Sequence, residues 1–238
     1  MPSVSSGDRQ FAVIIPAAGA STRFVGFETT KPFVELNGTP VWIRTVNHFI
    51  HRADVSETIL VAAEADLPAF RESASDDILS RLKFAPGGAT RAESVLNGVQ
   101  RLSLPAEFVA VHDAARPLLT DSGITDLFAA AKVHDAVVPG VPVTSTVKQV
   151  GPNGRVEKTI DRSVLQLAQT PQVVRRELLE SAYAGCAEVS AFTDEASLIE
   201  ATGHSVFVVP GWPENIKITT AEDFRLAEFL LGRHGLSS

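Results

Sequence analysis

Apolar stretches of strand length alternate with helical patterns through the first half of the chain. Parallel strands joined by helices produce this alternation, and the crossovers in such units are right-handed. The alternation therefore predicts a layered α/β sandwich. The candidate strands are Phe11–Ile15, Thr58–Ala63, Arg81–Ala85, Glu107–His112 and Ala136–Pro139, and the candidate helices between them are Val41–His51, Leu67–Leu79, Arg91–Leu102 and Ser122–Val133.

The segment from Pro142 to Ile160 interrupts this alternation and predicts a β-hairpin. Two largely polar stretches, VTSTVKQV and RVEKTI, flank the turn sequence GPNG. An isolated hairpin with few apolar partners is only marginally stable in water, so we expect it to pack against something else. Beyond it the pattern predicts helices at Val174–Glu188 and Asp194–Ala201, a strand at Val206–Val209, and a last helix opened by Thr219 with Glu222 in a capping box.

Composition limits the partners of this chain. Its 238 residues include 28 acidic and 21 basic side chains, and the formal charge of −7 excludes a general basic surface for nucleic acid. Cys186 is the only cysteine, which fits a reducing compartment. No apolar run reaches membrane-spanning length, and Met1–Gln10 has neither the length of a transit peptide nor the apolar core of a secretory signal. We therefore expect a protein of the bacterial cytoplasm, without nucleic-acid or membrane partners.

A loop of small residues follows the first strand. The stretch Ile14–Lys31 reads IIPAAGASTRFVGFETTK, and Pro16 ends the strand because it cannot donate to the sheet. The small residues after it let backbone N–H groups approach phosphate oxygens, and Arg23 and Lys31 add positive charge. The segment indicates a triphosphate-binding loop, although it matches neither Walker A nor GxGxxG, and a plain strand-to-helix turn is an equal alternative.

Two further clusters carry groups suited to a nucleotide. In Gly87–Ser94, paired glycines precede a helix start capped by Thr90 and Glu93, which suits a nucleotide as well as it suits an ordinary turn. In the motif HDAARP, Asp113 follows an apolar strand, where a carboxylate can hold a hard cation against phosphates. Arg116 lies close enough to bind a second anion. The alternative is that Asp113 caps a helix or pairs with Arg116.

The second half of the chain adds candidate substrate groups. Arg162 lies at the base of the hairpin, where a surface ion pair is the simplest interpretation. Thr170 precedes a proline that holds it extended, which could aim its hydroxyl or merely bend the chain. Lys217 alternates with two isoleucines, so its ammonium is expected on the face opposite the core. The histidines lack convincing metal-ligand spacing, and His112 is interpreted as a hydrogen-bonding group at a strand end.

The order of these motifs matches that of a known family. The motifs PAAG-x-x-x-R, GG-x-x-R-x-x-S, HDAARP, DR, QTPQ, TDEAS and NIK extend from Phe11 to Leu231. With them the chain resembles the 2-C-methyl-D-erythritol 4-phosphate cytidylyltransferase family of the non-mevalonate isoprenoid pathway. The resemblance implies a Rossmann-like nucleotidyltransferase fold with a mostly parallel sheet in a three-layer sandwich. It also implies one domain over residues 1–238, a projecting dimerisation arm at 142–160, and a homodimer with shared active sites.

The same resemblance implies ligands and residue roles. CTP would be the co-substrate, a small alditol phosphate the acceptor, and Mg²⁺ the divalent cation, held by Asp113. Arg23, Lys31, Arg162 and Lys217 match the catalytic positions, and Arg116, Thr146, Arg162, Thr170 and Thr193 match the substrate side. The positions that would bind CTP are Ala17, Ala18, Gly19, Ala20, Arg23, Lys31, Gly88, Ser94 and Ala114.

The implied reaction transfers CMP from CTP to 2-C-methyl-D-erythritol 4-phosphate, giving 4-diphosphocytidyl-2-C-methyl-D-erythritol and pyrophosphate. The acceptor phosphate is largely dianionic at neutral pH, so its attack needs no general base. Three alternatives stay open: a ribitol 5-phosphate cytidylyltransferase, a sugar-1-phosphate nucleotidyltransferase that uses UTP or GTP, and a non-catalytic nucleotide sensor. The PAAG opening and HDAARP argue against the first, whose loop usually opens LAGG, and intact Asp113, Arg162 and Lys217 argue against the sensor.

Overall fold

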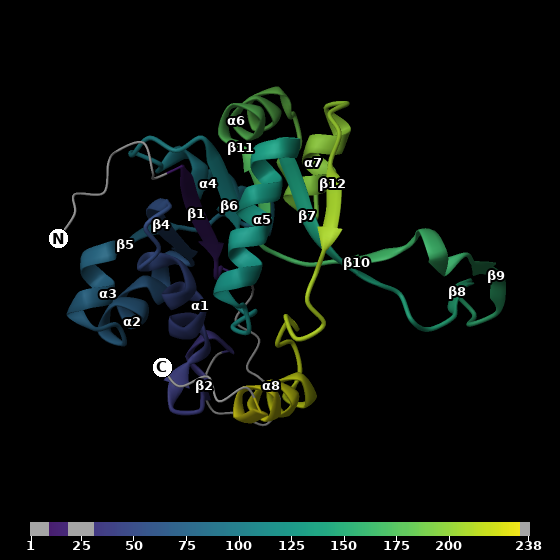
Figure 1. The fold of residues 1–238 in the computed structure, drawn as a ribbon, viewed down its shortest axis with the longest axis horizontal. Coiled ribbons are helices and arrows are strands. Elements are labelled where there is room, and N and C mark those ends of the chain that lie inside the picture. The colour runs from purple at the N-terminus through teal and green to yellow at the C-terminus, as the bar shows by residue number, and fades with distance from the viewer. Residues whose placement is uncertain (1–9, 19–30, 234–238) are drawn as a thin grey trace.

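A mixed sheet of eight strands forms the centre of the structure, a computed structural model in which residues 10–18 and 31–233 are described (Figure 1). Its strands are β1 (Phe11–Pro16), β4 (Val55–Ala62), β5 (Leu82–Pro86), β6 (Phe108–Val111), β7 (Ala136–Pro142), β10 (Gln166–Ala168), β11 (Gln172–Arg175) and β12 (Phe207–Pro210). Their order is β10-β7-β11-β6-β1-β4-β5, with β12 also paired to β7. β1 runs parallel to β4 and β6, β4 to β5, and β12 to β7, which confirms the predicted α/β class.

Helices cover both faces of the sheet and complete the three layers (Figure 1). The alternation along β1 explains this arrangement, because Phe11, Val13 and Ile15 join one apolar cluster while Ala12 and Ile14 join the other. The first cluster includes residues of α1 (Val41–Ile50), α2 (Leu67–Glu72), α3 (Asp76–Arg81) and α5 (Asp121–His134), and the second includes residues of α4 (Arg91–Gln100), α6 (Arg176–Gly185) and α7 (Glu195–Ala201).

A third apolar cluster lies under the C-terminal helix α8 (Ala221–Arg233). It joins Phe224 of that helix to Leu36, at the end of the short strand β2 (Glu35–Leu36), which pairs with β3 (Thr39–Pro40). Ile218 belongs to the same cluster and is 4% exposed. The segment that carries Lys217 is therefore held by the packing of its neighbour, as the alternation with isoleucines predicted.

Capping side chains set two of the helix starts that the sequence predicted. Thr90 and Glu93 form the expected capping box at α4. At α8 the capping box was predicted at Thr219 and Glu222, but it forms one residue later, at Thr220 and Asp223. Thr220 accepts a hydrogen bond from the N–H of Asp223, and the Asp223 carboxylate accepts one from the N–H of Thr220.

Two predicted helices are shorter than their patterns suggested. The stretch Leu67–Leu79 is divided into α2 and α3, because the Ser75 side chain caps a new helix start. Val174 lies in β11 instead of a helix, and α6 begins only at Arg176. β11 runs antiparallel between β6 and β7, and β10 runs antiparallel to β7. β10 has only three residues, and the end of β11 continues into the helical pattern of α6, so the pattern did not separate these two strands.

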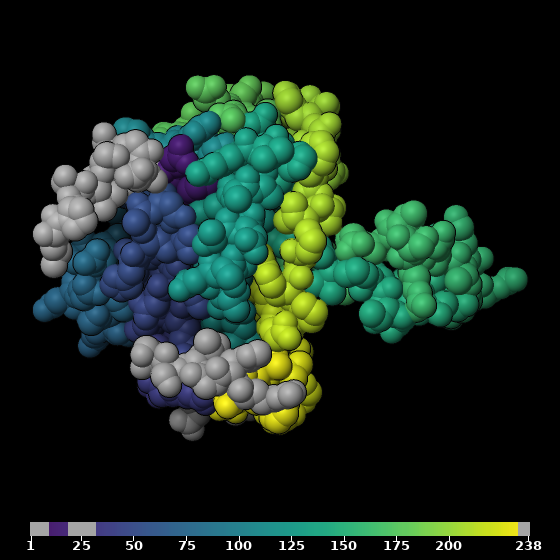
Figure 2. Space-filling view, viewed as in Figure 1, coloured from purple at the N-terminus to yellow at the C-terminus, as the bar shows by residue number. Residues whose placement is uncertain are grey.

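The predicted hairpin consists of β8 (Val147–Val150) and β9 (Val156–Ile160), which pair antiparallel. It projects from the body of the molecule as an arm (Figures 1 and 2). The side chains of both strands are mostly exposed, and Val150 and Val156 are 56% and 52% exposed. We expected the hairpin to pack against another surface, and the body of the described chain does not supply one, because the arm stands apart from it (Figures 1 and 2).

Candidate active site

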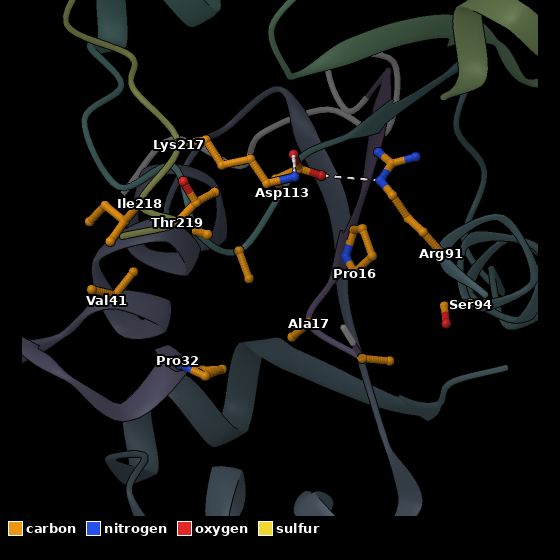
Figure 3. A pocket seen from close by; sticks show the side chains of 13 residues that line it. Pro16, Ala17, Pro32, Val41, Arg91, Ser94, Asp113, Lys217, Ile218 and Thr219 are labelled. Atoms are coloured by element: carbon orange, nitrogen blue, oxygen red, sulfur yellow. Dashed lines mark hydrogen bonds and ion pairs between the residues drawn. The ribbon is translucent and has the colours of Figure 1, made fainter. Parts of the chain in front are cut away.

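A cavity of about 350 Å³ opens at the carboxyl ends of β1 and β6, beside the start of α4 (Figure 3). Ligands of open parallel sheets bind at this edge, because the loops that follow neighbouring strands meet there. Five groups of residues from different parts of the chain supply the walls. They are Pro16, Ala17 and Ala18; Pro32 and Val41; Arg91 and Ser94; Asp113, Ala114 and Ala115; and Lys217, Ile218 and Thr219.

The loop after β1 packs tightly against the loop before α4. The N–H of Ala17 donates to Val61 O at 2.7 Å, and that of Gly87 donates to Ala62 O at 2.8 Å, so β4 holds both loops. A Cβ on Gly87 would lie only 2.5 Å from the Cβ of Ala18. The close approach of the two loops therefore requires glycine at position 87. A Cβ on the neighbouring Gly88, the position that sequence reasoning selected, would lie 2.4 Å from the Cβ of Glu93, so both glycines are enclosed.

Ser94 organises the loop before α4 from within. Its hydroxyl accepts a hydrogen bond from the N–H of Gly88 at 3.1 Å and donates to Thr90 O at 2.8 Å. Both hydrogen bonds are local, and the side chain is 1% exposed while still contributing to the cavity wall. Ser94 and Gly88, both predicted as nucleotide-binding positions, are thus hydrogen-bonded to each other, and Ser94 lines the cavity.

Three cations surround the carboxylate of Asp113, and Figure 3 shows two of them, Lys217 and Arg91. Lys217 Nζ lies 2.9 Å from Oδ2, Arg91 Nε lies 3.2 Å from Oδ1, and Arg116 Nε lies 3.7 Å from Oδ2. Burial alone would raise the pKa of Asp113, but the charges of Arg91 and Lys217 hold this pKa well below its usual value. The carboxylate is therefore ionised throughout the neutral range. Lys217 keeps 44% of its side chain exposed, so its ammonium remains available to a ligand.

Arg91 also binds a second carboxylate, that of Glu195. Nη1 and Nη2 of the guanidinium lie 2.9 and 3.1 Å from Oε1 and Oε2 of Glu195, a bidentate pair. Glu195 is 1% exposed, at the start of α7. Sequence reasoning placed both residues within motifs but gave neither a role. The available signal was that Asp113, Glu195 and Arg91 each lie in one of the motifs. The sequence does not show that the fold brings these three side chains into contact.

Behind Asp113, a chain of hydrogen bonds fixes the backbone of the HDAARP motif. His112 is fully buried, and its Nε2 lies 3.0 Å from Arg116 O, so Nε2 carries the proton. Its Nδ1 then accepts from the Thr170 hydroxyl at 3.0 Å, and the Thr170 oxygen accepts from the N–H of Asp113 at 3.1 Å. Burial lowers the pKa of His112 to about 3, which keeps it neutral. Thr170, predicted on the substrate side, is placed behind the cavity wall with its hydroxyl already hydrogen-bonded.

Arg116 connects the HDAARP motif to the segment that carries Lys217. Its Nη1 donates to Asn215 O at 2.7 Å, and the N–H of Ile218 donates to Ala115 O at 2.9 Å. Asn215 is fully buried and donates from Nδ2 to Thr170 O at 2.8 Å. These contacts explain how a C-terminal segment without regular secondary structure can hold Lys217 on Asp113.

Comparison with known proteins identifies the family. A family model described as 2-C-methyl-D-erythritol 4-phosphate cytidylyltransferase matches residues 11–233. This chain belongs to that family. The relative of that name from Symbiobacterium thermophilum is 42% identical over 92% of this chain and 92% of its own length. The chloroplastic relative from Oryza sativa is 35% identical over 94% of this chain and 75% of its own length.

Solved structures of cytidylyltransferases in this family share the fold. The Anaerococcus prevotii structure, described as a 4-diphosphocytidyl-2C-methyl-D-erythritol synthase, has a TM-score of 0.80 and 27% identity, and covers 95% of this chain and 100% of its own. The Francisella tularensis 2-C-methyl-D-erythritol 4-phosphate cytidylyltransferase has a TM-score of 0.78 and 33% identity, and covers 92% of this chain and 99% of its own. The expected nucleotidyltransferase fold and family are thereby confirmed.

Several positions that the cytidylyltransferase resemblance predicted lie away from this cavity. Arg162 and Thr146 are exposed at the base of the arm, where Arg162 Nη1 donates to Thr144 O. Thr193 is exposed just before α7. None of these three belongs to the described cavity wall of this one chain. Gly19, Ala20 and Arg23 lie outside the described residues, and Lys31 is described only as the first residue of the short 3₁₀ helix Lys31–Phe33.

The donor set suits a cation that arrives with a triphosphate. Among residues 10–18 and 31–233, no group of three or more His, Cys, Asp or Glu side chains could hold a metal ion by itself. Mg²⁺ is commonly bound by one or two carboxylates together with substrate phosphates. Asp113, ionised and facing the cavity, fits the single-carboxylate case.

Proposed function

We propose that this member of the family transfers CMP from CTP to 2-C-methyl-D-erythritol 4-phosphate, with 4-diphosphocytidyl-2-C-methyl-D-erythritol and pyrophosphate as products. The observation that carries the proposal is the meeting of Asp113, Lys217 and Arg91 at the cavity beside the small-residue loop. One ionised carboxylate and several cations suit a chemistry in which two polyanions must be brought together. Family membership supplies the identity of the acceptor.

CTP would occupy the cavity with its phosphates toward Asp113 and Lys217. The volume of about 350 Å³ is within the range of small-molecule sites. We assign the remaining nucleotide contacts to the positions that the resemblance indicated. These are Ala17, Ala18, Gly88, Ser94 and Ala114, with Gly19, Ala20, Arg23 and Lys31.

The reaction would proceed by in-line displacement at the α-phosphorus of CTP. An oxygen of the acceptor phosphate forms the new bond to this phosphorus, and the bond to the β-phosphate bridging oxygen breaks, releasing pyrophosphate. The acceptor phosphate, with a second pKa near ~6, is already largely dianionic at pH 7, so no protein group needs to remove a proton. In keeping with this, no histidine is among the described residues that line the cavity.

The chain's cations would position the reactants and offset the growing charge. Lys217, with Arg23 and Lys31, would contact the triphosphate, and Asp113 would hold a divalent cation. Bound there, magnesium would offset negative charge on the phosphate oxygens. Arg116 Nε is buried and lies 3.7 Å from Asp113 Oδ2, too far for a hydrogen bond, so it could donate one to a further anion.

We further propose a homodimer in which the arm of residues 142–160 reaches the partner's cavity, with residues 1–238 as one domain. The exposed apolar side chains near the arm favour this arrangement, because Val164 and Leu167 are 78% and 60% exposed. Arg162, Thr146 and Thr193 would then serve the acceptor in a site built from two chains. Within one chain, Arg162 and Thr146 lie outside the cavity wall.

We assign the enzyme to the bacterial cytoplasm. The lone Cys186 fits a reducing compartment. Within the described ranges, no helix combines the length and apolarity that a transmembrane span requires.

A nucleotide and acceptor panel tests the function. Pyrophosphate release would be measured from each of the four NTPs, with either 2-C-methyl-D-erythritol 4-phosphate or ribitol 5-phosphate as acceptor. We expect the highest kcat/KM with CTP and the methylerythritol phosphate. A preference for ribitol 5-phosphate, or for UTP or GTP, would favour one of the enzymatic alternatives, and binding of CTP without turnover would favour the sensor.

A further inference from the structure

Glu195 is a buried charged group that the proposed reaction does not use. It does not line the cavity, and its carboxylate is bound only through the Arg91 guanidinium among the described side-chain ion pairs. Arg91, in contrast, lines the cavity and contacts Asp113. The described ion pair that links Glu195 to the cavity therefore runs through Arg91.

The geometry around Arg91 divides one guanidinium between two carboxylates. Glu195 takes both terminal nitrogens, at 2.9 and 3.1 Å, and Asp113 receives only Nε, at 3.2 Å. Guanidinium and carboxylate groups form their strongest pairs through two parallel hydrogen bonds. Without Glu195, the Arg91 guanidinium could rotate, and its nitrogens could bind both carboxylate oxygens of Asp113.

We propose that Glu195 is a positioning residue: by holding the terminal nitrogens of Arg91, it limits Arg91 to one hydrogen bond with Asp113 and leaves the remaining acceptor positions of that carboxylate to the divalent cation of the triphosphate. This inference rests on the proposed cytidylyltransferase function. Glu195 thus acts from behind the cavity, as the outer partners of metal ligands commonly do. Its position at the start of α7, where Asp194 caps the helix, fixes its backbone.

Glu57 provides a matched control for the test. It too is a buried glutamate in an ion pair, with its Oε2 atom 2.6 Å from Lys83 Nζ, and it accepts hydrogen bonds from the N–H groups of Ser103 and Leu104. Glu57 lies in the first half of β4, whereas the cavity lies at the carboxyl ends of the parallel strands. Glu57→Gln therefore removes a comparable buried charge without touching the site.

The experiment compares the wild type, Glu195→Gln, Glu195→Asp and Glu57→Gln. CTP affinity would be measured by isothermal titration calorimetry with magnesium and with EDTA, and kcat, KM and melting temperature would be measured beside it. For Glu195→Gln we expect about a 10- to 100-fold loss of kcat/KM and a matching loss of the magnesium-dependent gain in CTP affinity. Glu195→Asp keeps the charge on a shorter side chain. It should therefore retain more of kcat/KM, and more of the magnesium-dependent gain in CTP affinity, than Glu195→Gln.

Glu57→Gln should lower the melting temperature while keeping the wild-type response of CTP affinity to magnesium. If Glu195→Gln showed that same behaviour, the pair would serve stability alone and the inference would be overturned. Should Glu195→Gln not fold, Glu195→Asp decides: wild-type magnesium dependence overturns the inference, and a several-fold loss supports it. A wild type that shows no turnover with any NTP would instead contradict the proposed function.

Discussion

Lys217 Nζ lies 2.9 Å from Oδ2 of Asp113, so a segment near the C-terminus supplies a cation to the carboxylate that follows a central strand. Lys217 is held there by the buried neighbour Ile218 and by the contact of Arg116 with Asn215 O. The pair joins the middle of the chain to its C-terminal region, at the point where we propose that the phosphates of a nucleotide lie. Both members can therefore be tested separately for their role in catalysis.

Asp113→Asn should lower kcat/KM by about 10²-fold or more, or about 2.7 kcal/mol, because the amide keeps the shape but not the charge that would hold a divalent cation. The fold should survive, as judged by circular dichroism. Steady-state kinetics at several magnesium concentrations would measure the loss. Wild-type turnover and wild-type magnesium dependence in this variant would show that the carboxylate does not anchor the cation.

Lys217→Ala should lower kcat by about 10²-fold with little change in melting temperature. The reason is that a cation used on the transition state contributes little to the ligand-free fold. Its side chain is nearly half exposed, and Asp113 retains Arg91 and Arg116 as partners. Calorimetry and steady-state kinetics on the same preparation would measure both quantities. Unchanged kinetics would make Lys217 an ordinary surface lysine.

Gly87→Ala should destabilise the protein by about 1–3 kcal/mol and weaken CTP binding, since the added Cβ would lie 2.5 Å from that of Ala18. Gly185→Ala is the control, because a Cβ there meets nothing within 4 Å. We expect it to be neutral or slightly stabilising. Urea unfolding and CTP titration would measure both effects. Equal stability and CTP affinity in the two variants would contradict the close loop packing.

Stability should fall on acidification below pH 6.5, partly through His112. Its folded pKa of about 3 lies below the unfolded value of about 6.5, so between these values the unfolded state binds more protons and stability falls as pH falls. The contribution is at most about 1.4 kcal/mol per pH unit, and His48, whose pKa burial also lowers, adds to it. The free energy of unfolding, measured with urea from pH 7 to pH 4, should change less steeply with pH in His112→Gln than in the wild type. Parallel curves would refute the buried neutral histidine.

A shared active site predicts complementation between two inactive variants. Lys217→Ala damages the cavity and Arg162→Ala damages the arm, so a mixed dimer would contain one doubly altered site and one intact site. After subunit exchange of equal amounts, about half of the dimers would be mixed and roughly a quarter of the wild-type activity should return. With subunit exchange confirmed by mass spectrometry, a lack of recovery would place Arg162 and Lys217 in one site of one chain.

The sequence predicted most of the architecture because its signals are local. β1 is a continuous apolar run that ends at Pro16, and α4 begins at a capping box, so both could be recognised from short windows. β10 was missed because three residues carry no periodicity, and β11 because its last residues continue into the pattern of α6. The pairing of both strands is decided by β7 and β6 across the sheet.

The candidate site was predictable only in part, for the same reason. Asp113 and Lys217 stood out through their motifs, and the structure brings them together. The role of Glu195 depends on a pair formed between α4 and α7, and the enclosure of Gly87 depends on its contact with Ala18. Neither contact leaves a pattern in the sequence, because both arise from the packing of segments that are distant along the chain.

The most direct test of the account is the identity of the phosphorus-containing products. ³¹P NMR of a reaction with CTP, magnesium and 2-C-methyl-D-erythritol 4-phosphate should show pyrophosphate and a cytidine diphosphate ester in equal amounts. Asp113→Asn should form both at the same reduced rate. Formation of CMP and pyrophosphate without the diphosphate ester, or no consumption of the methylerythritol phosphate at all, would contradict the account.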